Sequence, residues 1–388
     1  MSFLLPFLLI IFTFFGLAVV VDEFLVPAVY SLRKIFNWTD DQTGTAISFV
    51  SSAPELSVSA VSLFLAARGG GVDSGSMGPG TVIGSALFSI LFIVGASSWF
   101  ATKKLSWTSV VRDMGFYILS VLAVYLVVLD QIVAWWEPVL LLGLFAVYSL
   151  TVAKWKTILK WLDKNVNSKI IDEEAEIAKE ISQKLEVKEE FKLHLKEQKW
   201  SPSNFVAKVL SYLYFDLTEK NSQKTPIWKM IWNVSLSILF VIFFSTLMVD
   251  NAVSLATFFK ISPVVISLTI LAAGTSIPDL LASIKTAREG YGDTAVANAV
   301  GSNIFDILAN LGLTWGIGII IGGGKSLKVD TNNLNGSILL LLASTISLIM
   351  VLIAKKFHLG RVVSVILMSS YVFYIAFEVA KASGIIKL

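Results

Sequence analysis

Long apolar runs alternate with short polar segments along the chain, and this pattern predicts a membrane protein. About ten runs are long enough to cross a bilayer, since roughly 20 apolar residues span its core as a helix. The predicted helices cover residues 3–30, 43–67, 80–101, 109–129, 133–153, 229–249, 261–287, 294–322, 335–354 and 362–382. The first run lacks the basic flank and the small-residue cleavage site of a signal peptide, so we interpret it as a retained helix.

The predicted helices form two groups of five, which indicates an all-α polytopic membrane protein built from two repeats. We expect a first transmembrane repeat at 1–153, a cytoplasmic loop at 154–228 and a second transmembrane repeat at 229–388. Because each group holds an odd number of helices, the second repeat enters the membrane in the inverted orientation. In the loop, Ile177, Ile181 and Leu185 recur every fourth residue and predict an amphipathic helix. We interpret it as a solvated linker rather than a calcium sensor, because no EF-hand spacing occurs there.

Lys and Arg residues in the loops predict the orientation. One side would hold Arg33, Lys34, Lys103, Lys104, Arg112, Lys154, Lys156, Lys285, Arg288, Lys355, Lys356 and Arg361. The other would hold Arg68, Lys260, Lys325, Lys328, Lys381 and Lys387. The more basic side should be cytoplasmic, which places the central loop in the cytoplasm and both termini on the opposite side.

Composition narrows the function. The net charge of +3 is too small to imply nucleic acid, and 55% of the residues are hydrophobic. The chain has no Cys, so thiolate metal sites are excluded, and its two histidines, His194 and His358, fall outside the apolar runs. A His-ligated metal or a haem within the membrane is therefore not expected.

The two halves share two sequence motifs. Residues 51–56 (SSAPEL) match residues 275–280 (TSIPDL), and residues 84–91 (GSALFSIL) match residues 301–308 (GSNIFDIL). The motifs fall in the second and third predicted helices of each half, so they form an inverted repeat. Secondary transporters use such repeats, with the substrate site near the middle of the membrane where the repeats meet.

The first motif carries a carboxylate into each apolar helix. Glu55 and Asp279 would each cost roughly 2.5–3.5 kcal/mol at the bilayer centre if unpaired, and no Lys or Arg lies within either helix core. Pro54 and Pro278 deprive the carbonyl oxygens of Val50 and Gly274 of their helical hydrogen bonds. Carboxylates beside free carbonyls at membrane depth indicate a cation site.

The second motif adds further oxygen atoms at helical spacing, because Ser85 and Ser89 are four residues apart, as are Ser302 and Asp306. Hard oxygen ligands without nitrogen or sulfur suit calcium and sodium. The candidate ligands are Glu55, Asp279, Asp306, Ser51, Ser52, Thr275, Ser276, Ser85, Ser89, Ser302 and the carbonyls of Val50 and Gly274.

These motifs resemble those of the potassium-dependent sodium/calcium exchangers, within the cation/calcium exchanger superfamily. The resemblance rests on residues 21–27 (VDEFLVP), 52–56 (SAPEL), 81–88 (TVIGSALF), 271–279 (LAAGTSIPD) and 301–307 (GSNIFDI). It implies ten helices, a calcium site formed by Glu55 and Asp279, and sodium sites that share those ligands. It also implies alternating access by two gating helices that slide over a core, and it links Asp306 to potassium. The chain departs from the family pattern at Val50, at Ser89 and in a glycine-rich insert at 69–80, which should lengthen the loop before the third helix.

The expected function is therefore an antiport of sodium against calcium, with potassium carried together with calcium. A proton/calcium antiporter of the same fold is the alternative. An intramembrane aspartyl protease or an ion channel would be a different class, and both leave the inverted repeat unexplained. We expect no enzyme activity and no cofactor, and a monomer or homodimer in the bilayer of the plasma membrane or an organelle.

Overall fold

The computed structural model describes residues 4–36, 51–66, 75–100, 107–155, 157–158, 202–215, 226–288, 292–324, 326–329, 331, 334–355 and 360–382. Eight helices in this part of the chain are long and apolar enough to cross a membrane. Two shorter apolar helices, Ala53–Leu65 and Pro263–Thr275, complete the set. Each of these ten segments overlaps one of the ten predicted runs, so the all-α polytopic prediction is confirmed.

The elements follow the sequence in two series, with four short π-helical segments labelled η. The first series is α1 Leu4–Val19, η1 Val20–Leu25, α2 Val26–Phe36, α4 Ala53–Leu65, α6 Met77–Leu87, η3 Phe88–Ile93, α7 Val94–Phe100, α8 Trp107–Val128, β1 Ile132–Ala134 and α9 Trp136–Ala153. After α12 Pro202–Ser211, the second series is α14 Ile227–Phe259, α15 Pro263–Ile266, η5 Ser267–Leu271, α16 Ala272–Thr275, α17 Ile277–Arg288, α18 Gly292–Phe305, η6 Asp306–Asn310, α19 Leu311–Ile321, β2 Ser326–Lys328, α20 Leu334–Ala354 and α21 Arg361–Ala382.

The chain packs as two compact units. The larger contains Met1–Ala18, Ser51–Phe145 and Leu239–Leu388, and the smaller contains Val19–Val50 and Ala146–Ile238. All four motif segments belong to the larger unit. Its only strands among the described residues, β1 and β2, pair antiparallel with Val133 opposite Leu327, which joins the loop after α8 to the loop after α19.

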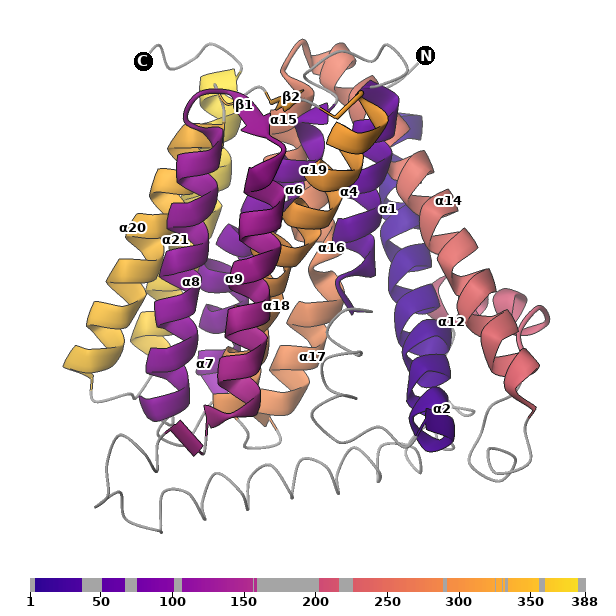
Figure 1. The fold of residues 1–388 in the computed structure, drawn as a ribbon, viewed down its shortest axis with the longest axis horizontal. Helices are drawn as coiled ribbons and strands as arrows, with labels where there is room; N and C mark the ends of the chain where they lie inside the picture. The colour runs from indigo at the N-terminus through magenta and orange to yellow at the C-terminus, as the bar shows by residue number, and fades with distance from the viewer. Residues whose placement is uncertain are drawn as a thin grey trace. The chain divides into compact units, whose positions relative to one another are not determined.

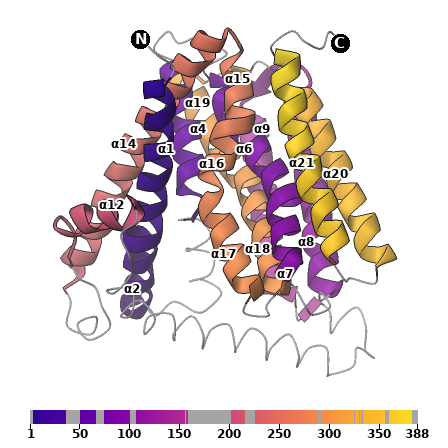
Figure 2. The ribbon, with the colours of Figure 1, turned by 180° about the vertical axis from the view of Figure 1, so that it is seen from behind.

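Equivalent helices of the two halves run in opposite directions within the larger unit (Figures 1 and 2). The α6–η3–α7 helix descends from the upper end of the unit in Figure 1, and the α18–η6–α19 helix rises from the lower end. Likewise α4 runs from mid-height to the upper end, and α17 runs from mid-height to the lower end. The inverted repeat expected from the sequence is therefore the arrangement of the fold.

Small residues let the motif helices approach each other closely. A Cβ atom added to Gly84 would lie 2.3 Å from the Leu268 carbonyl oxygen and 2.6 Å from the Ala272 Cβ. The third helix of the first half therefore packs directly on the backbone of the second helix of the second half, as small residues at membrane helix interfaces permit. At Gly274 an added Cβ would lie 1.9 Å from the ring of Phe14, so α1 packs against the second-half motif.

The smaller unit is held together by polar and aromatic contacts around the chain that follows α12. The Asn233 side chain accepts a hydrogen bond from the Phe215 N–H at 3.0 Å and donates one to the Phe215 carbonyl at 2.8 Å. Tyr214 stacks on Phe24 with ring centroids 4.0 Å apart, and its hydroxyl accepts a bond from Ser237. The amphipathic helix predicted around residues 177–185 lies outside the described residues.

Two helix boundaries differ from the prediction. The sixth helix was expected to end at residue 249, but α14 continues to Phe259, because a polar residue such as Asp250 does not break a helix. The helix ends where Lys260 adopts φ +56°, and Ser262 and Pro263 start the next one. In addition, the third helix was expected to start at residue 80, but α6 begins at Met77, inside the glycine-rich insert. Gly78 and Gly80 are buried in this helix, where close packing leaves no room for a larger side chain.

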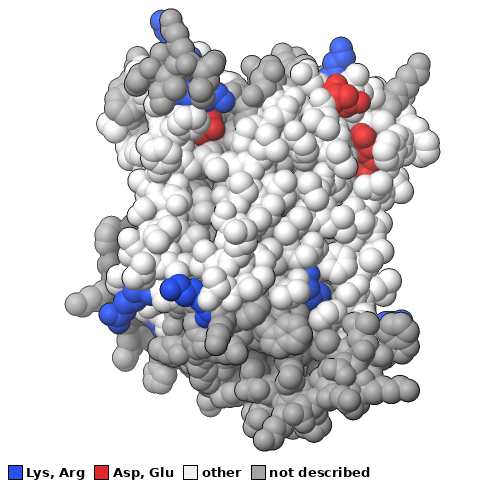
Figure 3. Space-filling view, turned by 90° about the vertical axis from the view of Figure 1, so that its left-hand side faces the viewer, with Lys and Arg blue, Asp and Glu red and all other residues white. Residues whose placement is uncertain are grey.

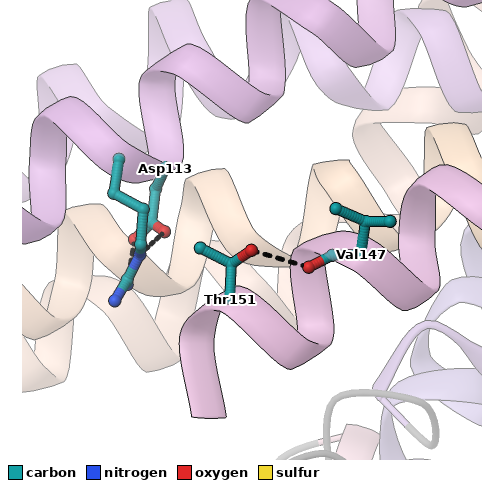
Figure 4. Close-up of polar contacts among 4 residues, drawn as sticks. Asp113, Val147 and Thr151 are labelled. Carbon is teal, nitrogen blue, oxygen red and sulfur yellow. Dashed lines mark hydrogen bonds and ion pairs between the residues drawn. The ribbon is translucent and has the colours of Figure 1, made fainter. Parts of the chain in front are cut away.

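On the face drawn in Figure 3, exposed charge lies toward the two ends of the molecule. An uncharged band has basic side chains below it and both acidic and basic side chains above it. At the lower end of Figure 1, Arg288 lies over Phe100 and Arg361 lies over Trp99. Arg112, next to Asp113 in sequence, binds both oxygens of that carboxylate at 2.7 and 3.0 Å, which neutralises the charge on a mostly buried helix face (Figure 4).

Replacing Gly84 with Ala should destabilise the protein by about 1–3 kcal/mol, because the new methyl group meets backbone that cannot move aside. Gly115→Ala is the matched control, since an added Cβ at Gly115 has no neighbour within 4 Å. Thermal unfolding of the detergent-solubilised variants measures the difference. Equal melting temperatures for the two variants would contradict the close packing at Gly84.

Candidate ion-binding site

The second helix of each half is interrupted at the same motif position. Ser52 has φ −84° and ψ 8°, and its counterpart Ser276 has φ −91° and ψ 3°. Each break lies two residues before the motif proline, Pro54 or Pro278, whose ring cannot donate the next helical hydrogen bond. The broken backbone predicted from the prolines is therefore present in both halves, at mid-height of the larger unit (Figure 1).

Two carboxyl groups lie deep inside the larger unit beside these breaks. Glu55 and Asp306 each expose only 3% of their surface. The Thr275 hydroxyl lies next to the Glu55 carboxyl, and the Ser52 hydroxyl lies next to the Asp306 carboxyl. Each acid thus has its neighbouring hydroxyl on the other half of the chain, which places the cluster where the repeats meet.

A direct hydrogen bond joins two of the four motif segments. The hydroxyls of Ser85 and Ser276 are 2.6 Å apart and both side chains are buried. This bond joins the third helix of the first half to the break in the second half. The two repeats are therefore in direct contact at this break.

Three acidic side chains lie near one another, and the two that are buried, Glu55 and Asp306, have no basic partner among the described residues. Glu55, Asp279 and Asp306 are close enough to repel one another, and Asp279 is partly exposed. Within the described ranges, no Lys or Arg forms an ion pair with Glu55 or Asp306. In the same part of the chain, no three Asp, Glu, His or Cys side chains converge closely enough to hold one metal ion by themselves. Any ion here must therefore also use neutral oxygen ligands.

The remaining predicted ligands differ in what surrounds them. Ser89 is buried and its hydroxyl has no hydrogen-bond partner in the described structure. Ser302 is buried, and its hydroxyl makes only a long bond of 3.4 Å to the Ala299 carbonyl. Ser51 is partly exposed, Gly274 is buried under Phe14, and Val50 lies outside the described residues.

Three polar residues near Asp306 were missed by the sequence reasoning. Asn303 and Asn310 are fully buried on the same helix, three residues before Asp306 and four residues after it. Their spacing alone was a signal, because such neighbours share a helix face. Tyr117 of α8 is within electrostatic reach of Asp306, but its helix carries no motif, so only the folded structure reveals it.

This donor set fits a hard cation. Asp306 Oδ1, Ser89 Oγ and both polar atoms of the Asn310 amide are buried without a hydrogen-bond partner among the described residues. Buried polar atoms normally have partners, and a carboxylate without a counter-ion is costly in a membrane. Carboxylate, hydroxyl and amide oxygens are the ligands that calcium prefers, and two or three acids supply charge to balance a divalent ion.

Comparison with known families agrees with this chemistry. The family model described as sodium/calcium exchanger protein matches residues 6–154 and 229–380, which is most of the chain and omits the central stretch. The chain belongs to the sodium/calcium exchanger protein family. It is therefore an integral membrane transporter that exchanges calcium for another cation, and it is not an enzyme, which removes the intramembrane protease alternative.

Curated relatives of this exchanger cover nearly its whole length. Human sodium/potassium/calcium exchanger 4 is 25% identical over 505 residues, covering 95% of this chain and 80% of the relative. Human sodium/potassium/calcium exchanger 5 is 26% identical over 437 residues, covering 98% and 84%. Both matches agree with the branch that the sequence motifs resemble.

Solved structures share the fold. The sodium-calcium exchanger NCX_Mj superimposes with a TM-score of 0.51 at 20% identity, covering 97% of this chain and 99% of that one. The H+/Ca2+ exchanger CAX superimposes with a TM-score of 0.60 at 13% identity, covering 98% and 90%. Because both kinds of exchanger adopt this fold, the fold alone does not identify the counter-ion.

Glu55→Gln and Asp279→Asn should each abolish calcium transport, because each removes one of the few charges that can neutralise a divalent ion. Glu378→Gln is the matched control, since Glu378 is a buried carboxyl on α21, 5% exposed. Calcium uptake into vesicles with equal amounts of inserted protein measures the effect. Near-normal uptake by either site variant would remove that residue from the site.

Proposed function

We propose that this exchanger moves calcium against sodium and carries potassium together with calcium. The observation that carries the proposal is the cluster of Glu55, Asp279 and Asp306 at the breaks of the two inverted repeats. Calcium and sodium are close in size and both take oxygen ligands, so either one calcium or several sodium ions can neutralise the same acids. Sharing ligands makes their occupancy mutually exclusive, which is the physical basis of exchange.

We further propose that Asp306 requires the potassium ion. Glu55 and Asp279 together balance one calcium, and Asp306 adds a surplus negative charge inside a site of low dielectric. A proton or a monovalent cation must cancel that charge. The similarity to sodium/potassium/calcium exchangers favours potassium, which is abundant in the cytoplasm.

We propose that α1 and α14 serve as the sliding gates that the resemblance implies. On one side, the Phe14 ring of α1 covers Gly274 of the second-half motif. On the other, Ser245 of α14 hydrogen-bonds Ser57 of α4, two residues after Glu55. The two gates also contact each other through Phe12 and Phe244, whose ring centroids lie 5.9 Å apart. Displacing both helices together would open the cluster without disturbing the core helices.

We also propose the topology and the domain division expected from the sequence. Residues 1–153 and 229–388 form the two transmembrane repeats, and residues 154–228 form a cytoplasmic loop. Three basic residues support a cytoplasmic lower end in Figure 1: Arg288 at the end of α17, Lys355 directly after α20 and Arg361 at the start of α21. The start of α1 and the end of α21 lie at its opposite end, which favours both termini on the other side of the membrane.

The test of the proposal is calcium flux in proteoliposomes with sodium, potassium and proton gradients imposed separately. An outward sodium gradient should drive calcium uptake, and a proton gradient alone should not. Uptake driven by protons and indifferent to sodium would replace the proposal with proton/calcium antiport, which the fold shared with CAX also accommodates.

Calcium exchange should require potassium, and Asp306→Asn should preserve exchange while removing that requirement, because the surplus charge is gone. The measurement is sodium-driven calcium flux with potassium replaced by a large organic cation. Wild-type exchange that ignores potassium would contradict the prediction, and so would an Asp306→Asn variant that still depends on it.

A tag inserted after Asn165 should be accessible only from the cytoplasmic side, whereas tags at the two ends should be accessible from the opposite side, because Lys and Arg favour the cytoplasm. Protease protection in sealed vesicles of known orientation measures this. Finding the loop and both ends on one side would refute the five-plus-five inversion.

A further inference from the structure

Two arginines lie against consecutive aromatic residues at the end of α7, at the lower end of Figure 1. The guanidinium carbon of Arg288, the last residue of α17, lies 4.3 Å from the ring centroid of Phe100. That of Arg361, the first residue of α21, lies 5.6 Å from the ring centroid of Trp99. A cation within about 6 Å of an aromatic centroid is attracted to the ring. The end of α7 therefore holds two positive charges that come from two different helices.

Neither guanidinium has an anionic partner in the described part of the chain. Arg112 binds both oxygens of the Asp113 carboxylate, whereas Arg288 and Arg361 form no ion pair or hydrogen bond among the described residues. Both side chains are exposed. An aromatic ring attracts a cation but carries no full negative charge, so the N–H donors of both arginines remain available to an anion from outside the protein.

Arg361 and Trp99 lie where the surface of the protein meets lipid. The residues that follow Arg361 on α21 have exposed apolar side chains: Val362 is 74% exposed, Val365 47% and Ile366 59%. Because α21 is long and apolar enough to cross the membrane, these side chains face the acyl chains. Trp99 is 40% exposed, and tryptophan is enriched at the level of the lipid headgroups. The pair is therefore placed at the height of those headgroups.

Close packing between α7 and α21 fixes the position of this pair. A Cβ atom added to Gly95 of α7 would lie 3.0 Å from the Met368 Cγ and 3.1 Å from the Ser364 carbonyl oxygen of α21. Trp99 follows Gly95 by four residues and Arg361 precedes Ser364 by three, so each lies about one helical turn from the contact. The ring and the guanidinium group are thus carried by two helices that are held together nearby.

We propose that Arg361 and Trp99 form a binding site for the phosphate group of an anionic phospholipid, whose acyl chains lie along the exposed face of α21. Arginine suits phosphate because its planar N–H groups can bind two oxygens at once. Basic residues at a membrane surface attract anionic headgroups, whereas a choline group would be repelled by Arg361 and by Arg288 on the same end of α7. The site is separate from the acidic ion-binding cluster and does not depend on which ions are exchanged.

The test measures the melting temperature of the full-length protein in mixed micelles that contain phosphatidylcholine or phosphatidylglycerol with the same acyl chains. Phosphatidylglycerol should raise the melting temperature more than phosphatidylcholine does. Arg361→Gln should raise the half-saturating mole fraction of phosphatidylglycerol by about fivefold, because one basic contact is lost. Arg361→Lys, which keeps the charge without the planar fork, should have an intermediate effect. Comparing the two lipids within each variant cancels any change in its intrinsic stability.

Lys355→Gln is the matched control, because Lys355 is exposed directly after α20 at the same end and lies over no aromatic ring among the described residues. It should keep the wild-type half-saturating mole fraction. Equal weakening by Lys355→Gln and Arg361→Gln would indicate general surface charge and overturn the site. A wild-type protein that responds equally to both lipids would overturn it too. Inorganic phosphate added to phosphatidylcholine micelles should have no effect, and a shift as large as that of phosphatidylglycerol would replace the lipid with a free anion.

Discussion

Burying carboxylates in a hydrocarbon environment is the constraint that organises this molecule. Glu55 and Asp306 lie inside apolar helices with no Lys or Arg paired to them in the described structure, and such charges are tolerated only where compensating groups surround them. The helix breaks at Ser52 and Ser276 supply backbone and hydroxyl oxygens at that depth. The close packing at Gly84 brings the helices that carry these groups together. In the proposed exchange, cations would supply the positive charge that no Lys or Arg supplies here.

Most of the fold could be predicted from the sequence, because a segment that crosses the membrane must be a helix of about 20 apolar residues. Apolar runs of sufficient length located ten helical segments, and the proline motifs located the breaks to within two residues. One helix end was predicted wrongly. Asp250 looked like an end because the apolar run stops there, but helical hydrogen bonding continues through polar residues until the backbone turns at Lys260.

The site was predicted only as far as its motifs extend. Glu55, Thr275, Asp306, Ser52, Ser85 and Ser276 are brought together as neighbours. The pairing of each acid with a hydroxyl from the opposite half depends on the packing of helices distant in sequence, which helical spacing does not give. Tyr117 shows the same limit, because nothing in the sequence of α8 singles it out until the fold brings it within electrostatic reach of Asp306.

The π-helical segments η3 and η6 bear on the ancestry of the chain. They begin at Phe88 and Asp306, which are within one residue of equivalent positions in the aligned repeats. A π turn accommodates one extra residue in a helix, and two independent insertions at the same place would be a coincidence. The insertion therefore predates the duplication that produced the two halves, whereas the substitutions that separate Ala86 from Asn303 and Ser89 from Asp306 followed it. The backbone shape of these two helices is therefore older than their present chemical asymmetry.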